Sequence, residues 1–251
     1  MKKLKKMLYE VKLINRSVPG LLIALLITSV IMMNILANKS LHTNIPYLAL
    51  DCGILFSWIT FFVMDIVVKR FGLKAANILT ILGLITNLFF AIILLACSFI
   101  PGEWSQSYVT GSEEVINNAL DLTFRGSWYV LLGSSVAYLV SSIVNNVLNH
   151  FIGKKIDNNK GFKGFALRSS ISTFIAQFID NLVFALIVSL NFFGWSIVEC
   201  ITCALTGAIL ELILEMIFSP VAFKLCKKWE NENVGIEYLE YINGGQNESS
   251  N

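Results

Sequence analysis

Charged residues are scarce in this chain. Only 14% of its 251 residues are Asp, Glu, Lys or Arg, whereas soluble domains carry roughly a quarter. Hydrophobic residues make up 55% of the chain, and the mean hydropathy is +0.68. This composition excludes an ordinary soluble domain and indicates a membrane protein.

Several motifs of enzymes and energy-coupling proteins are also missing. The chain has no glycine-rich P-loop, so it is not itself an ATP-driven pump. It has neither an HExxH zinc motif nor a Gly-x-Ser-x-Gly nucleophile motif. The five cysteines all lie in apolar runs, where cysteine behaves as a small hydrophobe. We therefore expect no enzymatic activity, no cofactor and no bound metal.

Six apolar runs reach the roughly 20 residues that a membrane-spanning helix requires. Backbone groups in lipid are satisfied only in helices or closed barrels, and these runs are too long for barrel strands. We predict an all-α membrane protein, a bundle of six transmembrane helices in residues 1–228, with a frayed polar tail in residues 229–251. The predicted helices are Val18–Ala37, Leu48–Val68, Ala75–Ile100, Trp128–Leu148, Ser169–Phe192 and Ser196–Phe223.

The basic residues predict how this bundle is oriented. Every Lys and Arg except Lys39 and Arg125 lies in the N-terminal arm, in the second–third or fourth–fifth loop, or after the last span. Cytoplasmic loops of membrane proteins carry an excess of such residues. We therefore expect both termini in the cytoplasm. The long loop 101–127 is then external, and it is acidic.

The second predicted helix, Leu48–Val68, carries an aspartate near each end. Asp51, Trp58 and Asp65 repeat at intervals of seven residues. Fourteen residues fall about 40° short of four helical turns, so all three should share one face, with the acids about 21 Å apart. A charge at membrane depth costs at least a few kcal/mol, so such a face should line a cavity or contact a partner. A polar ladder that holds helices together is the alternative interpretation.

Polar side chains recur at helical spacing in other predicted spans as well. Any one such stripe can be explained by interhelical hydrogen bonding, but several together favour a shared wet cavity. Glu211 and Glu215 lie one turn apart in the last span, on one face. The other polar residues of these stripes are Asn34 in the first span, Ser135, Tyr138, Ser142, Asn145 and Asn149 in the fourth, and Ser169, Thr173, Gln177 and Asp180 in the fifth.

The run FFVMDIVVKRFGLKAA, residues 61–76, resembles the bacterial queuosine-precursor transporters, also called the VUT family. The matching residues are Asp65, Lys69 and the Phe71-Gly72 pair. In the fifth predicted helix, SSISTFIAQFIDNLVF resembles the family through Asp180 and Phe184. NILANKSLH and AYLVSSIVNN resemble its first and fourth helices. Two positions depart from the pattern, because Asn145 replaces a common aspartate and the last helix has glutamates where the family often has lysine.

The resemblance implies a bacterial cytoplasmic-membrane importer of 7-cyano- or 7-aminomethyl-7-deazaguanine, a secondary carrier for which proton coupling is one option. One carboxylate can accept the adjacent N1–H and amine donors of a guanine-like edge. We expect Asp65 or Asp180 to do so, with Trp58 stacked on the base. The predicted substrate-binding residues are Asp65, Asp180, Trp58, Asn34, Gln177 and Asn145, and those for proton coupling or entry are Asp51, Glu211 and Glu215.

Other interpretations stay open at this point. The chain could be the substrate-binding membrane subunit of an ATP-driven vitamin importer, although the small residues of Ala24–Thr28 are only a faint trace of a docking surface. It could also carry another nucleobase-like or vitamin-like solute. A scaffold without transport activity leaves six embedded acids unexplained. The expected partners are a small-molecule substrate and the lipid bilayer, without nucleic acid, and homo-oligomerisation is open.

Overall fold

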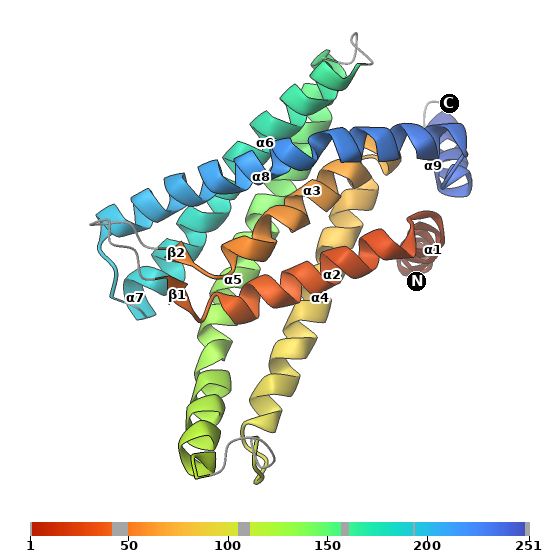
Figure 1. Ribbon diagram of the computed structural model, residues 1–251. Coiled ribbons are helices and arrows are strands. Elements are labelled where there is room, and N and C mark those ends of the chain that lie inside the picture. The colour runs from red at the N-terminus through yellow and green to blue at the C-terminus, as the bar shows by residue number, and fades with distance from the viewer. Residues whose placement is uncertain (1, 42–49, 105–110, 157–160, 193, 249–251) are drawn as a thin grey trace.

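A computed structural model shows a chain that is almost entirely helical (Figure 1). The structure describes residues 2–41, 50–104, 111–156, 161–192 and 194–248. The helices are α1 (Lys2–Ser17), α2 (Gly20–Leu36), α3 (Ile54–Phe71), α4 (Leu73–Cys97), α5 (Glu113–Ile156), α6 (Phe162–Phe184), α7 (Leu190–Phe192), α8 (Ile197–Asn231) and α9 (Ile236–Glu248). A π-helical turn, η1 (Ala185–Ser189), continues α6, and strands β1 (Ser40–Leu41) and β2 (Leu50–Asp51) pair antiparallel.

Four described segments are long and apolar enough to cross a membrane: Leu73–Cys97, Trp128–Lys155, Phe162–Ser189 and Ile197–Asn231. A fifth results if α1 and α2, which meet at 105°, count as one broken span. α2 has 17 residues and α3 has 18, at the short end of the spanning range. The all-α membrane fold is therefore confirmed, while the count of six spans and the orientation stay predictions.

The surface of α4 shows why this fold requires lipid. Its exposed side is a stripe of large apolar residues, whereas its buried side is small or polar. Lipid tails contact the exposed apolar side in place of water, and the small residues of the buried side allow neighbouring helices to pack closely. The exposed residues are Ile81, Ile85, Phe89 and Ile92, and the buried ones are Ala76, Thr80, Gly83 and Asn87.

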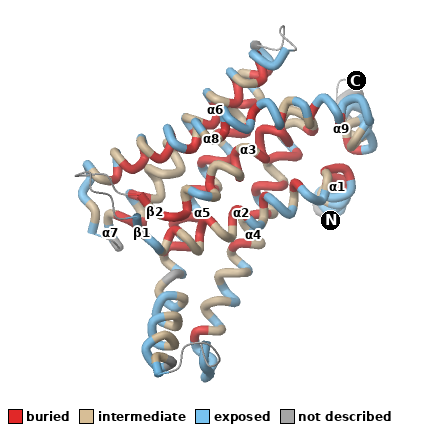
Figure 2. The backbone as a smooth tube through the Cα atoms, viewed as in Figure 1, coloured by how far each residue is buried: buried red, intermediate tan, exposed pale blue. Residues whose placement is uncertain are grey.

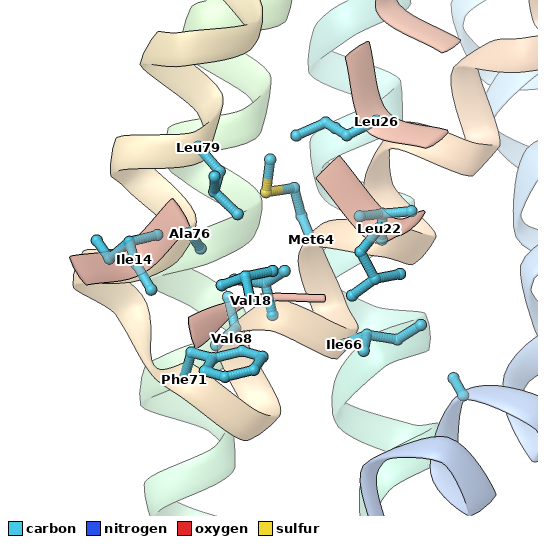
Figure 3. Packing of buried hydrophobic residues seen from close by; sticks show 14 of the residues in the cluster. Ile14, Val18, Leu22, Leu26, Met64, Ile66, Val68, Phe71, Ala76 and Leu79 are labelled. Atoms are coloured by element: carbon cyan, nitrogen blue, oxygen red, sulfur yellow. The ribbon is translucent and has the colours of Figure 1, made fainter. Parts of the chain in front are cut away.

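The largest apolar core lies where α1, α2, α3 and α4 meet. Ile14 and Val18 from the α1–α2 corner pack there with Met64 of α3 and Leu79 of α4 (Figure 3). Buried residues gather in the centre of the bundle, whereas the lower ends of α4 and α5 are intermediate to exposed (Figure 2). This core fixes α3, and therefore the polar side chains that α3 carries.

The predicted helix Leu48–Val68 is wrong at its start. Residues 48 and 49 lie outside the described residues, Leu50 and Asp51 form β2, and α3 begins at Ile54. The Asp51 side chain accepts a 2.7 Å hydrogen bond from the Gly53 backbone N–H. Such a turn diverts the chain just before the helix. Asp51 consequently does not share a helical face with Trp58 and Asp65.

Other helices extend beyond the predicted spans. The second half of the predicted outer loop belongs to the 44-residue α5, and α6 begins at Phe162 rather than at Ser169. α8 continues through Pro220 to Asn231, because Ala222, Cys226 and Trp229 bury a face at helical spacing.

The polar tail is folded over its described residues 229–248, which corrects the expectation that it frays. α9 packs near α1, and the Tyr9 and Tyr241 ring centroids are 5.4 Å apart. Arg70, at the end of α3, donates a 2.7 Å hydrogen bond to the Val234 carbonyl. Tyr238 is fully buried. These contacts place the two ends of the chain at the same end of the molecule (Figure 1).

Candidate functional site

One face of α6 carries polar residues that belong to two separate clusters, one around Asp65 and one around Asp180. The predicted stripe of Ser169, Thr173, Gln177 and Asp180 does lie on this helix. Its first two residues contact Asp65 of α3, and Asp180 reaches a cavity further along. The polar faces of α3 and α6 therefore meet at Asp65.

The cavity lies between α2, β2, α3, α5, α6 and α8, and we call it the Asp180 cavity. It encloses about 470 Å³ of empty space, including its open mouth, of which about 40 Å³ is available to the centres of water molecules. A single water centre needs roughly 10–15 Å³, so this conformation has room for a few waters. The lining residues are Met33, Ala37, Leu50, Asp51, Gly53, Ile54, Ser57, Ser134, Asp180, Asn181, Phe184, Cys203 and Gly207.

Hydrogen bonds hold the polar groups of this cavity in place. Asp180 accepts a 2.6 Å bond from the Ser141 hydroxyl of α5. Asn181 donates a 3.2 Å bond to Glu211 of α8, and the Ser57 hydroxyl of α3 donates to the other oxygen of the same carboxyl. Three helices are thus joined through Glu211, directly behind the cavity wall.

Two further predicted residues contribute at the edge of the cavity. Asn34 of α2 accepts a hydrogen bond from the Ser134 hydroxyl, which lines the cavity, and donates a 2.8 Å bond to the Val30 carbonyl. Asn34 therefore does not line the cavity itself but holds the Ser134 side chain that does. Asp51 lines the cavity directly, from β2.

A second cluster surrounds Asp65, which is buried on α3. Its carboxylate accepts a 2.8 Å bond from Asn145 of α5 and a 3.2 Å bond from Thr173 of α6. The Ser169 hydroxyl is in hydrogen-bond contact with both Asp65 and Glu215 of α8. Four helices meet in this arrangement, which we call the Asp65–Glu215 pair.

The remaining predicted residues lie elsewhere. Gln177 is fully buried, and neither of its amide atoms has a hydrogen-bond partner among the described residues. Trp58 does not line the Asp180 cavity. Its ring stacks on Phe218 of α8 at 4.9 Å between centroids, beside Phe62. The structure thus divides the predicted single site into two clusters and leaves Trp58 outside both.

A buried base was missed by the sequence analysis. Arg168, assigned to a loop on its charge, lies inside α6 with 6% of its surface exposed. Its guanidinium lies 5.4 Å from the centre of the Phe165 ring. A Cβ at Gly153 of α5 would come within 2.7 Å of Arg168, so glycine there provides the space.

Several cavity residues also escaped the sequence analysis. Ser57, Ser134 and Ser141 are single serines without a distinctive pattern, and only the fold shows that they converge. Gly207 gave a weak signal, because a glycine inside a transmembrane helix often marks close approach of another group.

Among the described residues, no cluster of three or more His, Cys, Asp and Glu side chains could hold a metal ion.

The apolar exterior, the helical bundle and the partly polar cavity define a multi-pass helical membrane protein. The sequence profile of the family described as "Putative vitamin uptake transporter" matches residues 51–225, a range that contains the Asp65–Glu215 pair and most of the lining of the Asp180 cavity. The chain belongs to this vitamin uptake transporter family and is accordingly a membrane transporter. Comparisons with curated proteins and with solved structures give no match.

Proposed function

We propose that the protein imports a queuosine precursor, 7-cyano- or 7-aminomethyl-7-deazaguanine, and that the Asp180 cavity binds it. The observation that carries this proposal is the pairing of a carboxylate, Asp180, with a neighbouring amide, Asn181, on one wall of a cavity inside the bundle. Small-molecule sites commonly combine a few such polar groups with apolar walls. The sequence resemblance to queuosine-precursor transporters supports the choice of cargo.

The polar groups suit a deazaguanine. Its N1–H and exocyclic amine are adjacent donors that one carboxylate accepts together. Asp180 is only half-buried, so it can present a carboxyl oxygen to the cavity while Ser141 holds the carboxylate. Asn181 can donate to the carbonyl of the base. Phe184, on the same wall, offers an aromatic surface in the role that the sequence analysis gave to Trp58.

Binding requires the cavity to widen. The space for a few waters is too small for a bicyclic base, so cargo entry must move at least one wall. Such a change between a closed and an open state is the motion expected of a carrier. We therefore propose a secondary carrier, driven by an ion gradient. Asp65, Asn145 and Gln177 then support the carrier rather than line the cavity.

The proposed carrier crosses the membrane six times, with both termini in the cytoplasm of a bacterial cell. Two observations support this arrangement. The basic residues of the chain are concentrated in segments that would face one side. α1 and α9 also lie at one end of the molecule, joined by the Arg16–Glu237 ion pair at 3.9 Å. Helices α2 and α3 would provide the two short crossings.

The decisive experiment is uptake of radiolabelled 7-cyano- and 7-aminomethyl-7-deazaguanine into bacteria that lack both their synthesis and their native importer. Cells with the wild-type protein should accumulate label. Asp180→Asn should abolish accumulation, because an amide cannot accept both donors. Glu230→Gln, at an exposed position of α8, is the matched control and should transport normally.

Each other outcome has a definite meaning. No uptake by the wild type refutes the cargo, and normal uptake by Asp180→Asn refutes the site. Uptake should stop when ion gradients are collapsed while ATP is maintained. Uptake that continues under those conditions but stops on ATP depletion would instead support the alternative of a binding subunit served by a separate ATP-hydrolysing module.

A further inference from the structure

Two buried acids outside the Asp180 cavity share a single hydroxyl group. The Ser169 hydroxyl contacts one carboxyl oxygen of Asp65 on α3 and one of Glu215 on α8. Asp65 is 1% exposed and Glu215 is 2% exposed. A serine hydroxyl has one hydrogen to donate. It therefore cannot satisfy two ionised carboxylates at the same time.

The donors around the pair are distributed unequally. Asp65 accepts bonds from the Asn145 amide at 2.8 Å and the Thr173 hydroxyl at 3.2 Å, in addition to its contact with Ser169. Glu215 bonds the Ser169 hydroxyl and lies within hydrogen-bond reach of Thr173 and Asp65, and its second carboxyl oxygen is buried without a partner among the described residues. Asp65 thus has the environment of a carboxylate, whereas Glu215 has that of a neutral acid.

The charges around the pair also favour an ionised Asp65 and a neutral Glu215. The positive charge of Arg168 on α6 acts on Asp65, and the charge of Asp65 acts on Glu215. On α3, Lys69 follows one turn after Asp65. On α8, Glu211 lies one turn before Glu215, and the Cys226 thiol lies about three turns after it. α5 contributes the neutral Asn145. Two adjacent negative charges in a medium of low dielectric repel strongly. One proton on Glu215 removes that repulsion.

We propose that the Asp65–Glu215 pair is the proton-binding site of the transporter, with the proton on Glu215. The Glu215 carboxylate takes up one proton from the side of high proton concentration, becomes a neutral acid, and releases the same proton on the other side. No bond other than O–H forms or breaks. This inference rests on the proposed function, because it assumes a gradient-driven carrier.

An unsatisfied acceptor next to the pair provides a second indication of a bound proton. The side-chain oxygen of Asn145 is fully buried and has no hydrogen-bond partner among the described residues, although its amide nitrogen bonds Asp65. A neutral carboxylic acid brings a hydrogen-bond donor into this cluster, whereas two carboxylates bring only acceptors. A protonated Glu215 therefore fits the chemistry of the site better than two carboxylates do.

The fold links this pair to the cavity through two helices. On α6, Thr173 and Asp180 are seven residues apart, which is about 10 Å along the helix. On α8, Glu215 lies one turn from Glu211, whose carboxyl bonds the cavity residues Asn181 and Ser57. A movement of α8 relative to α6 would change both clusters together. This connection provides a physical route from proton binding to opening of the cavity.

Infrared spectroscopy of the full-length protein tests the proton without any cargo. A buried carboxylic acid gives a carbonyl band that disappears as the pH is raised and the acid ionises. We expect the wild-type spectrum minus the Glu215→Gln spectrum to contain such a band, because other buried acids such as Glu211 contribute equally to both spectra. Glu230→Gln, exposed on the same helix, is the control and should keep it. Ser169→Ala retains both acids and should shift the pH at which the band disappears.

Transport measurements in proteoliposomes test the role of the proton. Glutamine has the shape of a protonated glutamate, so Glu215→Gln should fold and bind cargo. We expect it to exchange labelled for unlabelled deazaguanine as the wild type does, but to lose accumulation driven by a pH gradient. Accumulation that Glu215→Gln retains, or that a sodium gradient drives at fixed pH, would overturn the proposal.

The two levels of inference fail in different ways. If the wild type carries no deazaguanine, the proposed function is wrong, and the infrared measurement still decides whether Glu215 holds a proton. If the wild type carries deazaguanine but the Glu215→Gln spectrum equals that of the wild type, the proposed function stands and the proton site is refuted.

Discussion

Asn145 on α5 donates a 2.8 Å hydrogen bond to the buried Asp65 carboxylate on α3. Replacing it with Leu, which has a similar size, would leave the carboxylate short of one donor. The loss of such a bond to a charged group costs about 1–3 kcal/mol. We therefore expect Asn145→Leu to lower the thermal unfolding temperature in detergent. Ile143→Leu, at an exposed position of the same helix, is the control. Equal unfolding temperatures for both variants would show that the bond does not stabilise the bundle.

Gly207 permits the closest approach between α8 and the cavity residue Asn181. A Cβ at position 207 would lie 2.6 Å from the Asn181 amide nitrogen. Alanine must therefore displace Asn181 and weaken its 3.2 Å bond to Glu211. Overpacking of this kind costs about 1–3 kcal/mol, and we expect reduced cargo affinity in a binding assay with purified protein. Gly20→Ala, where a Cβ meets nothing within 4 Å, should bind cargo as the wild type does.

Trp58 distinguishes the sequence-based site from the structural one. It stacks on Phe218 and lies outside the lining of the Asp180 cavity, whereas Phe184 belongs to that lining. We expect Trp58→Leu to reduce thermal stability while leaving the apparent Km for cargo unchanged. Phe184→Leu should raise that Km. The opposite pattern, with a raised Km for Trp58→Leu alone, would return Trp58 to the site.

The membrane fold and the polar faces of single helices could be predicted from the sequence, because both follow from local patterns. Apolar length predicted the spans of α4, α5, α6 and α8. The four-residue and three-residue spacings on α6 placed Ser169, Thr173 and Asp180 on one helix face. Periodicity also gave Glu211 and Glu215 a common face, although it could not tell that they belong to different clusters.

What the sequence could not supply depends on contacts between distant segments. The exclusion of Asp51 from α3 results from a turn that its side chain forms with Gly53, and a heptad spacing across that turn has no meaning. Arg168 looked like a loop charge because its burial depends on space left by Gly153. The folding of the tail depends on Arg70, 164 positions before its partner Val234.

The predicted orientation can be tested by labelling single cysteines in intact cells. Glu103 and Lys155 are both exposed, and the positive-inside rule places them on opposite sides of the membrane. In a variant without the native cysteines, a membrane-impermeant maleimide should label Glu103→Cys in intact cells. It should label Lys155→Cys only after the membrane is permeabilised. Reversed labelling would invert the topology, and equal labelling would contradict the number of crossings between the two positions.

Gly235 allows α9 to dock on the α3–α4 corner. Its φ of +75° is unfavourable for a residue with a side chain, and a Cβ there would lie 2.4 Å from the Phe71 ring. A left-handed conformation alone costs about 1–2 kcal/mol, and the steric clash adds to it. We therefore expect Gly235→Ala to release α9 and to speed proteolysis after Val234. Gly244→Ala, where a Cβ meets nothing within 4 Å, should be digested as slowly as the wild type. Equal digestion of Gly235→Ala and the wild type would mean that α9 is held by contacts other than this corner.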